Sequence, residues 1–479
     1  MPSLRLWQYL GRVRGRNRAE KRENWTMANI GAENPVVSTG PSRSYLGPLA
    51  IVTTLFFMWG SLTSLNDVLI PYAQHVFKIR LAASMLIQTA FFSAYFFFSI
   101  PASKIINKIG YKKSIVVGLF IMVVACLGFF PAARVPSFPF FLFALICLAT
   151  GITVLQVAAN PYVAVLGKPQ TASSRLNLTQ AFNSLGTTVF PWIGANLILR
   201  TTAEAMNQSA TAEADAVVKL YVYFFATALT LLAIGIGLSK LPTIESVERP
   251  HGQKVADSVW KHPNLVFGAI GIFVYVGGEV AIGSSIANYL ALDNIGGFLS
   301  PESIPDAATR YRAALADAAK YISLYWGGAM IGRFIGSALL QKIKAGKLLA
   351  VAAIMACILV TVSVLTNGHI AMWSILAVGL FNSIMFPCIF TMGIDELGPL
   401  TGEGSGILNM AIVGGAIIPW IVGKVGDYIN HTYYPTLSQG ETSWGQGIHY
   451  ALIVAVLCYL YILFFAVSGS KTNSERAAR

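Results

Sequence analysis

The sequence predicts an all-α membrane protein in which twelve transmembrane helices form two pseudo-symmetric six-helix bundles. Composition is the first indication, because 55% of the 479 residues are hydrophobic and 11% are charged, against roughly 25% charged residues in soluble domains. The second is that the apolar residues gather in segments of about 20 residues, the length that crosses the hydrocarbon core. The third is an internal repeat, described below.

The chain begins with a basic segment, residues 1–46, which has few apolar residues. We expect a disordered cytoplasmic tail there, and no cleavable signal peptide, since no apolar segment follows the charges before Leu49. Lys and Arg concentrate in the segments that lie inside when the amino terminus is cytoplasmic, which is the positive-inside pattern. The net charge of +13 therefore indicates orientation in a membrane and not nucleic-acid binding. Both termini are expected in the cytoplasm.

Two bundles follow, an amino-terminal one over 47–240 and a carboxy-terminal one over 263–470. A charged cytoplasmic linker, 241–262, joins them, and a cytoplasmic tail, 471–479, ends the chain. The first six spans are predicted near residues 48–76, 81–106, 112–131, 137–166, 172–199 and 217–240. The second six are predicted near residues 263–291, 317–343, 347–366, 370–394, 403–428 and 446–469.

The two halves share motifs in the same order. Gln156 lies five residues before Pro161 in the fourth span, and Asn382 lies five residues before Pro387 in the tenth. The tripeptide Pro-Trp-Ile also recurs near the ends of the fifth and eleventh spans. Such six-plus-six repeats are typical of transporters whose halves move around a site near the membrane midplane.

The fourth and fifth spans carry polar stripes. Gln156 and Asn160 are one helical turn apart on the fourth span. The fifth span has polar residues at helical spacing, namely Gln180, Asn183, Ser184 and Thr187. Polar groups in hydrocarbon need partners, so such stripes face a protein interior or a hydrated cavity. Uncharged amides and hydroxyls suit an uncharged, polyhydroxylated ligand. The alternative for any single amide is a hydrogen bond to a neighbouring helix.

Asp67 is an ionisable residue within the first span, next to Asn66. A fixed charge at that depth costs about 2.5–3.5 kcal/mol on insertion scales. Protonation neutralises the carboxylate and removes this cost, so Asp67 is a candidate proton carrier. The alternative is a carboxylate that reaches water near the outer interface.

Other candidate residues lie in the second half. Glu279 and Arg333 are predicted either to form a structural charge pair or to take part in ion coupling. Trp59 and Trp326 each precede an ionisable residue of the same span by seven or eight positions, so they could stack on a sugar ring, although aromatic residues also serve packing and interfacial anchoring. Asn382 occupies the repeat position of Gln156.

Enzymatic and metal sites are not indicated. The five cysteines lie in apolar spans without paired spacing, which is typical of small buried residues and not of disulfides or metal ligands. No arrangement of nucleophile, base and orienting group is evident. We expect neither a cofactor nor a metal, and no enzymatic activity.

Long segments of both halves resemble one known family. They are FFMWGSLTSLNDVLIP, MLIQTAFFSAYFFFSIPAS, LQVAANPYVAVLGKPQTASSRLNLTQAFNSLGTT, GAIGIFVYVGGEV, YWGGAMIGRFIGS and GHIAMWSILAVGLFNSIMFP. They resemble the fucose/glucose/galactose permease branch of the major facilitator superfamily, most closely its bacterial glucose/galactose transporters. The resemblance covers roughly residues 46 to 470. It implies the twelve-helix major facilitator fold and sugar uptake coupled to a cation, usually a proton.

The resemblance also implies roles for single residues. The aspartate that handles protons in the fucose permeases matches Asp67, and their sugar-binding amides match Gln180 and Asn183. A glutamate of the fucose permeases is replaced here by Gln156, which does not titrate but can donate to and accept from hydroxyls. Asn107 stands near a position of the inner-gate motif where an aspartate is usual, so the usual charged latch is in doubt.

Together these observations predict a monomeric hexose:cation symporter of a bacterial inner membrane. Its cargo would be glucose or galactose with a proton. The predicted sugar-binding residues are Gln156, Asn160, Gln180 and Asn183, together with Asn66, Trp59, Trp326 and Asn382. The alternatives within this class are a sodium-coupled carrier, or a carrier of N-acetylglucosamine, fructose or fucose. Outside the class, the alternatives are a passive sugar pore and a sugar sensor.

Overall fold

The computed structural model describes residues 46–77, 86–135, 137–194, 215, 217–239, 241–242, 257–299, 302, 314–315, 317–433 and 446–477. All of these residues belong to one compact unit, 44–479. Residues 1–45 of the predicted tail lie outside the described residues. Throughout the described ranges the regular secondary structure is helical, without a β-strand.

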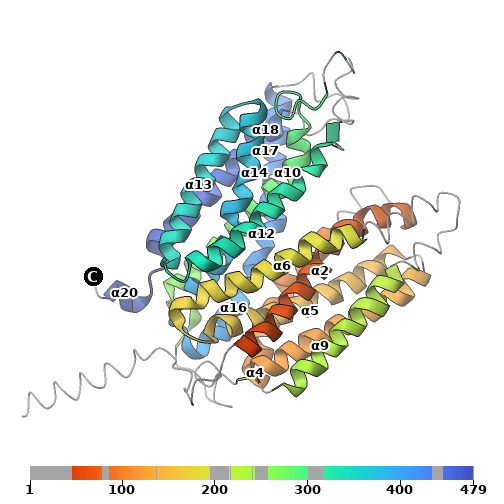
Figure 1. Cartoon of the computed structure of the whole chain (residues 1–479), viewed down its shortest axis with the longest axis vertical. Coiled ribbons are helices and arrows are strands. Elements are labelled where there is room, and N and C mark those ends of the chain that lie inside the picture. The colour runs from red at the N-terminus through yellow and green to blue at the C-terminus, as the bar shows by residue number, and fades with distance from the viewer. Residues whose placement is uncertain are drawn as a thin grey trace, which may run out of the picture. The chain divides into compact units, whose positions relative to one another are not determined.

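The helices of the two halves form two groups in Figure 1, coloured red to yellow-green and green to blue. The first half contains α2 (Leu46–Phe77), α4 (Leu86–Arg134), α5 (Phe138–Val165), η1 (Pro169–Thr171), α6 (Ala172–Gly194), the π-helix η4 (Lys219–Phe225) and α9 (Ala226–Leu238). The second half contains η5 (Val259–Lys261), α10 (Pro263–Leu290), α12 (Ile322–Leu339), α13 (Ala345–Leu365), α14 (Gly368–Asn382), α15 (Met385–Gly393), η6 (Gly398–Leu400), α16 (Thr401–Met410), η7 (Ala411–Val413), α17 (Gly414–Tyr433), α18 (Gly447–Ala451), α19 (Ile453–Phe464), the π-helix η8 (Phe465–Gly469) and α20 (Asn473–Ala477).

The described part of the chain contains nine helical segments that are long and apolar enough to cross a membrane. One of them, 86–132, has 47 residues, which is enough for two crossings of about 20 residues each. Its backbone breaks at Gly110, where φ is 79°, a value that glycine adopts without a steric penalty. The break falls between the predicted second and third spans. The all-α membrane class is therefore confirmed, and the helices are consistent with twelve crossings.

α6 and α12 are long helices that are not among these nine. The polar residues of the fifth span lie on α6, and Arg333 lies on α12, and these residues lower the mean hydropathy of both helices. The two helices pack against each other. Their polar residues can therefore be satisfied by protein and need not face lipid.

Both halves repeat one close contact between their first and fifth helices. A Cβ atom at Gly60 of α2 would overlap the carbonyl oxygen of Asn183 on α6. A Cβ atom at Gly277 of α10 would overlap Ile418 of α17. Glycine at both positions allows the paired backbones to approach closely, and the repetition of this contact agrees with the predicted pseudo-symmetry.

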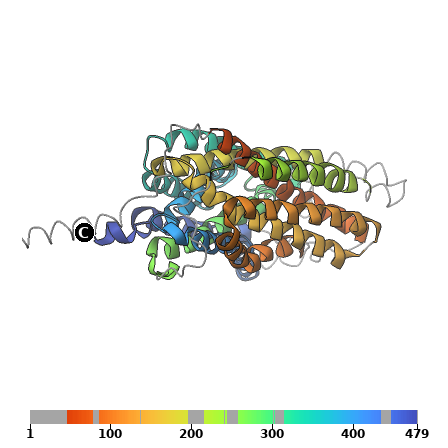
Figure 2. The same cartoon turned by 90° about the horizontal axis from the view of Figure 1, so that it is seen from below.

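Several helix contacts join the halves, including one between α6 and α15. We call the contact of α6 with α12 the α6–α12 seam, and the contact of α16 with α4 and α5 the α16 seam. The short helix α20 lies beside the carboxy terminus (Figure 2). Its Asn473 donates to the carbonyl oxygen of Lys261 at 3.1 Å, so this tail packs against the end of the linker.

Candidate functional site

The amides of the fourth span lie inside the first half. Gln156 and Asn160 are buried on α5, and Nε2 of Gln156 donates to the Tyr95 hydroxyl on α4 at 2.8 Å. Neither polar side-chain atom of Asn160 has a hydrogen-bond partner among the described residues. A buried polar group left unpaired costs about 1–3 kcal/mol. Asn160 is therefore a position where a ligand or water would gain hydrogen bonds.

Pro161 creates a further polar site on the same helix. Proline has no backbone N–H, so it leaves the carbonyl of Val157, four residues earlier, without its helical donor. The Oγ of Ser405 on α16 donates to this oxygen at 2.8 Å. Pro161 of the first half thus frees a carbonyl oxygen, and α16 of the second half donates a hydrogen bond to it.

Asn183 of the fifth span lies on the side of α6 that meets α2. Nδ2 of Asn183 donates to the carbonyl oxygen of Phe56 at 3.0 Å, and the side chain of Asn183 is half-buried. Gln180 is buried three residues earlier on α6. The close approach of α2 and α6 at Gly60 brings the Phe56 carbonyl within reach of Asn183.

Arg333 connects α6 to the second half. Its guanidinium donates to the hydroxyl of Ser184 and, at 3.3 Å, to the backbone oxygen of Gln180. Its Nε donates at 3.3 Å to the oxygen of Ser383, which Pro387 leaves without a helical donor. Part of the polar stripe of α6 therefore binds a neighbouring helix, one of the two roles that the sequence left open.

Serine residues extend the α6–α12 seam. The hydroxyl of Ser174 donates to the backbone oxygen of Ser337 at 2.7 Å, and the hydroxyl of Ser337 donates to the backbone oxygen of Ser174 at 3.0 Å. Nδ2 of Asn177 donates to the backbone oxygen of Arg333 at 2.7 Å. The hydrogen bonds across the α6–α12 seam therefore join uncharged groups, apart from those that the Arg333 guanidinium donates.

Asn382 belongs to a cluster of tyrosines and one carboxylate in the second half. Its Nδ2 donates to the Tyr325 hydroxyl at 2.8 Å, and that hydroxyl lies 3.2 Å from the backbone oxygen of Glu279. The Tyr275 hydroxyl donates to Oε1 of Glu279 at 2.7 Å. The halves thus repeat an amide–tyrosine hydrogen bond, Gln156 with Tyr95 and Asn382 with Tyr325.

The direct charge pair between Glu279 and Arg333 is not present in the structure. Glu279 is buried, and its carboxylate is engaged by Tyr275, one turn earlier on α10. Arg333 instead points toward α6, where the backbone oxygen of Gln180 and the hydroxyl of Ser184 accept hydrogen bonds from it.

The remaining predicted residues have different environments. Trp59 is 3% exposed, and its ring centroid lies 4.1 Å from that of Phe56, so it packs in the core. Trp326 is half-buried on α12 and lies against Gly283 of α10, where an added Cβ would be 2.9 Å from its ring. Asn66 and Asp67 lie on α2, but their side chains are outside the described part of the chain.

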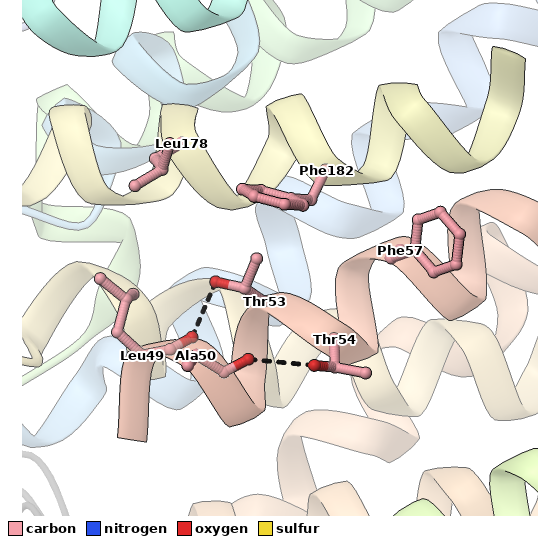
Figure 3. A pocket seen from close by; sticks show the side chains of 7 residues that line it. All are labelled: Leu49, Ala50, Thr53, Thr54, Phe57, Leu178 and Phe182. Atoms are coloured by element: carbon pink, nitrogen blue, oxygen red, sulfur yellow. Dashed lines mark hydrogen bonds between the residues drawn. The ribbon is translucent and has the colours of Figure 1, made fainter. Parts of the chain in front are cut away.

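A pocket of about 470 Å³ lies between α2 and α6 (Figure 3). Leu49, Phe57, Leu178 and Phe182 make its walls largely apolar. The hydroxyl of Thr53, which also lines it, donates to the backbone of its own helix. The lining contains none of the predicted sugar-binding amides, so this pocket is not the predicted site.

Sequence reasoning missed Ser405 and Asn409 of α16. Both are fully buried, and the amide oxygen of Asn409 has no hydrogen-bond partner among the described residues. The sequence did contain one signal for Asn409. It is an amide within the predicted eleventh span, as Asn382 is in the tenth. Within the described ranges, no group of three His, Cys, Asp or Glu side chains could hold a metal ion.

Comparison with known proteins relates this arrangement to a family. The Major Facilitator Superfamily model matches residues 50–419. A glucose/galactose transporter of Brucella abortus is 47% identical over 445 residues, covering 93% of this chain and 99% of that protein. The L-fucose-proton symporter of Escherichia coli is 31% identical over 457 residues, covering 91% of this chain and 96% of that protein.

A solved structure agrees with these matches. A crystal structure of the E. coli fucose:proton symporter superposes with a TM-score of 0.75 at 30% identity, covering 90% of this chain and all of that one. The matched proteins are transporters, which confirms that the chain is not an enzyme. It is a multi-pass membrane protein that belongs to the Major Facilitator Superfamily, in the branch of the glucose/galactose transporters and fucose–proton symporters.

Proposed function

We propose that this protein imports a neutral hexose, glucose or galactose, together with a proton, by alternating access. The observation that carries the proposal is the uncharged chemistry of Gln156, Tyr95 and Asn160 inside the first half. Amides and phenols donate to and accept from hydroxyls without requiring a charged ligand. The names of the relatives at 47% and 31% identity support a sugar and a proton as the cargo.

The α6–α12 and α16 seams support the transport mechanism. Their direct bonds use hydroxyls, amides and one guanidinium, groups that exchange protein partners for water when helices separate. We propose that the halves separate at these seams when the site opens inward. In this scheme Asp67 carries the proton, while Gln156, Asn160, Gln180 and Asn183 bind the sugar, and the protein acts as a monomer in a bacterial inner membrane with both termini in the cytoplasm.

The test is uptake of radiolabelled glucose and galactose into proteoliposomes under an imposed proton or sodium gradient. Fucose, fructose and N-acetylglucosamine serve as competitors. We expect accumulation driven by the proton gradient and inhibited by both aldohexoses. Accumulation driven by sodium alone would reject the proton, and equilibration without accumulation would indicate a pore. Binding without uptake would indicate a sensor.

Asp67→Asn tests the coupling residue in the same assay. Because asparagine does not titrate, we expect the variant to lose proton-driven accumulation and to retain exchange of labelled for unlabelled sugar. Accumulation equal to that of the wild type would remove Asp67 from the coupling mechanism.

A further inference from the structure

One face of α16 lies against the first half. An added Cβ at Gly402 would be 2.9 Å from Oδ1 of Asn107, and one at Gly406 would be 2.8 Å from Cβ of Ser103 and 3.1 Å from the oxygen of Ser99. Residue numbers rise along α16 as they fall along α4. The two helices are therefore antiparallel, and each turn of α16 faces a known turn of α4.

This register places Asn409 beside the amide site of the first half. Asn409 follows Ser405 by one helical turn and so shares its face of α16, the face that contacts α5. The next turn of α4 after Ser99 in this direction contains Tyr95, whose hydroxyl accepts the hydrogen bond of Gln156. Asn409 is thus the amide of the second half at the level of the Gln156–Tyr95 pair.

The hydrogen bonds of Asn409 leave one acceptor unused. Its Nδ2 donates to the backbone oxygen of Ser405 at 2.9 Å and lies 3.3 Å from the hydroxyl of Ser405. Its Oδ1 has no partner although the residue is fully buried. Gln156 uses its Nε2 as the donor to Tyr95, and its amide oxygen is a separate acceptor. A ligand that brings hydrogen-bond donors could therefore satisfy the oxygens of both amides.

We propose that Asn409 binds the transported sugar from the second half, opposite Gln156. This inference rests on the proposed function and adds a residue to its site. Sugar hydroxyls are donors, so one hexose can satisfy both amide oxygens, whereas an anion or an acceptor-only ligand does not. Because Gln156 and Asn409 belong to different halves, their joint contact makes sugar affinity depend on how the halves are arranged.

The first test measures hexose binding to the purified full-length chain in nanodiscs. Loss of one neutral hydrogen bond should weaken the affinity of Asn409→Ala for the hexose by about three- to tenfold, with the melting temperature near that of the wild type. Asn409→Ser keeps a small hydroxyl and guards against a folding defect of the alanine variant. Unchanged affinity in both variants would overturn the inference.

Asn264→Ala is the matched control. Asn264 is equally buried, and its Nδ2 donates to the backbone oxygens of Met392 and Asp395 at 3.1 and 3.0 Å. It therefore fixes α10 to the end of α15, and these hydrogen bonds involve none of α4, α5 and α16. We expect a lower melting temperature and unchanged hexose affinity. A loss of affinity equal to that of Asn409→Ala would attribute the effect to general destabilisation and overturn the inference.

The second test uses monodeoxy analogues of the hexose. If Asn409 accepts from one hydroxyl, removing that hydroxyl weakens binding to the wild type and has less effect in Asn409→Ala, so the two losses are not additive. Additive losses for every analogue would overturn the inference while the proposed function stands. A wild-type protein that neither binds nor transports any hexose would overturn both.

Discussion

At the scale of residues, two prolines at equivalent positions in the halves account for two hydrogen bonds between distant segments. Pro161 and Pro387 each release one carbonyl, and the released oxygens of Val157 and Ser383 are bound by Ser405 and by the Arg333 guanidinium respectively. The sequence identified both prolines and the amides five residues before them. It did not reveal the donors, because Ser405 and Arg333 lie on other helices, far along the chain.

Arg333 offers a test at this scale. Its guanidinium donates to Ser184, Gln180 and Ser383, and methionine would leave these oxygens without that donor. We expect Arg333→Met to lower the free energy of unfolding by about 1–3 kcal/mol and to slow uptake. Lysine keeps the charge but lacks the planar fork, so Arg333→Lys should be intermediate. The melting temperature and the initial uptake rate of each variant test this role of Arg333. A methionine variant as stable as the wild type would contradict it.

The residue scale also shows the limits of reading polar stripes. Gln156 and Asn160 were predicted as ligand groups; both are buried, and the amide atoms of Asn160 have no hydrogen-bond partner among the described residues. Ser184, predicted on the same argument, instead contacts Arg333. A helical wheel gives the face of a residue but does not say whether a cavity or another helix lies opposite. Only the packing of distant segments decides this.

At the scale of elements, the sequence predicted the spans well and their internal breaks poorly. The sixth span, predicted over 217–240, matches η4 and α9 over 219–238. The tenth was predicted as one helix over 370–394 but is divided into α14 and α15 at residues 383–384. Pro387 removes a helical hydrogen bond at this place. Hydropathy does not register such a break, because both parts remain apolar.

The contact of α2 with α6 gives a prediction for elements. In Gly60→Ala the new methyl group would overlap the backbone of Asn183, and the helices would have to move apart. We expect a loss of about 1–3 kcal/mol, as for other overpacked interiors. Gly47→Ala is the control on the same helix, since its Cβ would have no atom within 4 Å. Equal melting temperatures for the two variants would show that α2 and α6 do not pack closely at Gly60.

At the scale of the whole molecule, the proposed mechanism has the two halves separate at one side during transport. Ser174 and Ser337 face each other across the α6–α12 seam, with 3.4 Å between their hydroxyl oxygens. In a variant without the natural cysteines, Ser174→Cys combined with Ser337→Cys should form a disulfide on oxidation. We expect oxidation to abolish uptake and a reductant to restore it.

Each single cysteine variant serves as the control for this experiment and should transport sugar under both conditions. Uptake at the wild-type rate by fully cross-linked protein would mean that this seam stays closed throughout the cycle. The proposed movement of the halves would then be wrong at this contact.

The hydrogen bonds of the α6–α12 seam and the α16 seam differ in charge. A guanidinium holds α12 against α6, whereas a neutral hydroxyl of Ser405 holds α16 against α5. Charge-assisted hydrogen bonds are roughly twice as strong as neutral ones. The α16 seam should therefore separate before the α6–α12 seam. The inward opening would then begin at the α16 seam and continue at the α6–α12 seam.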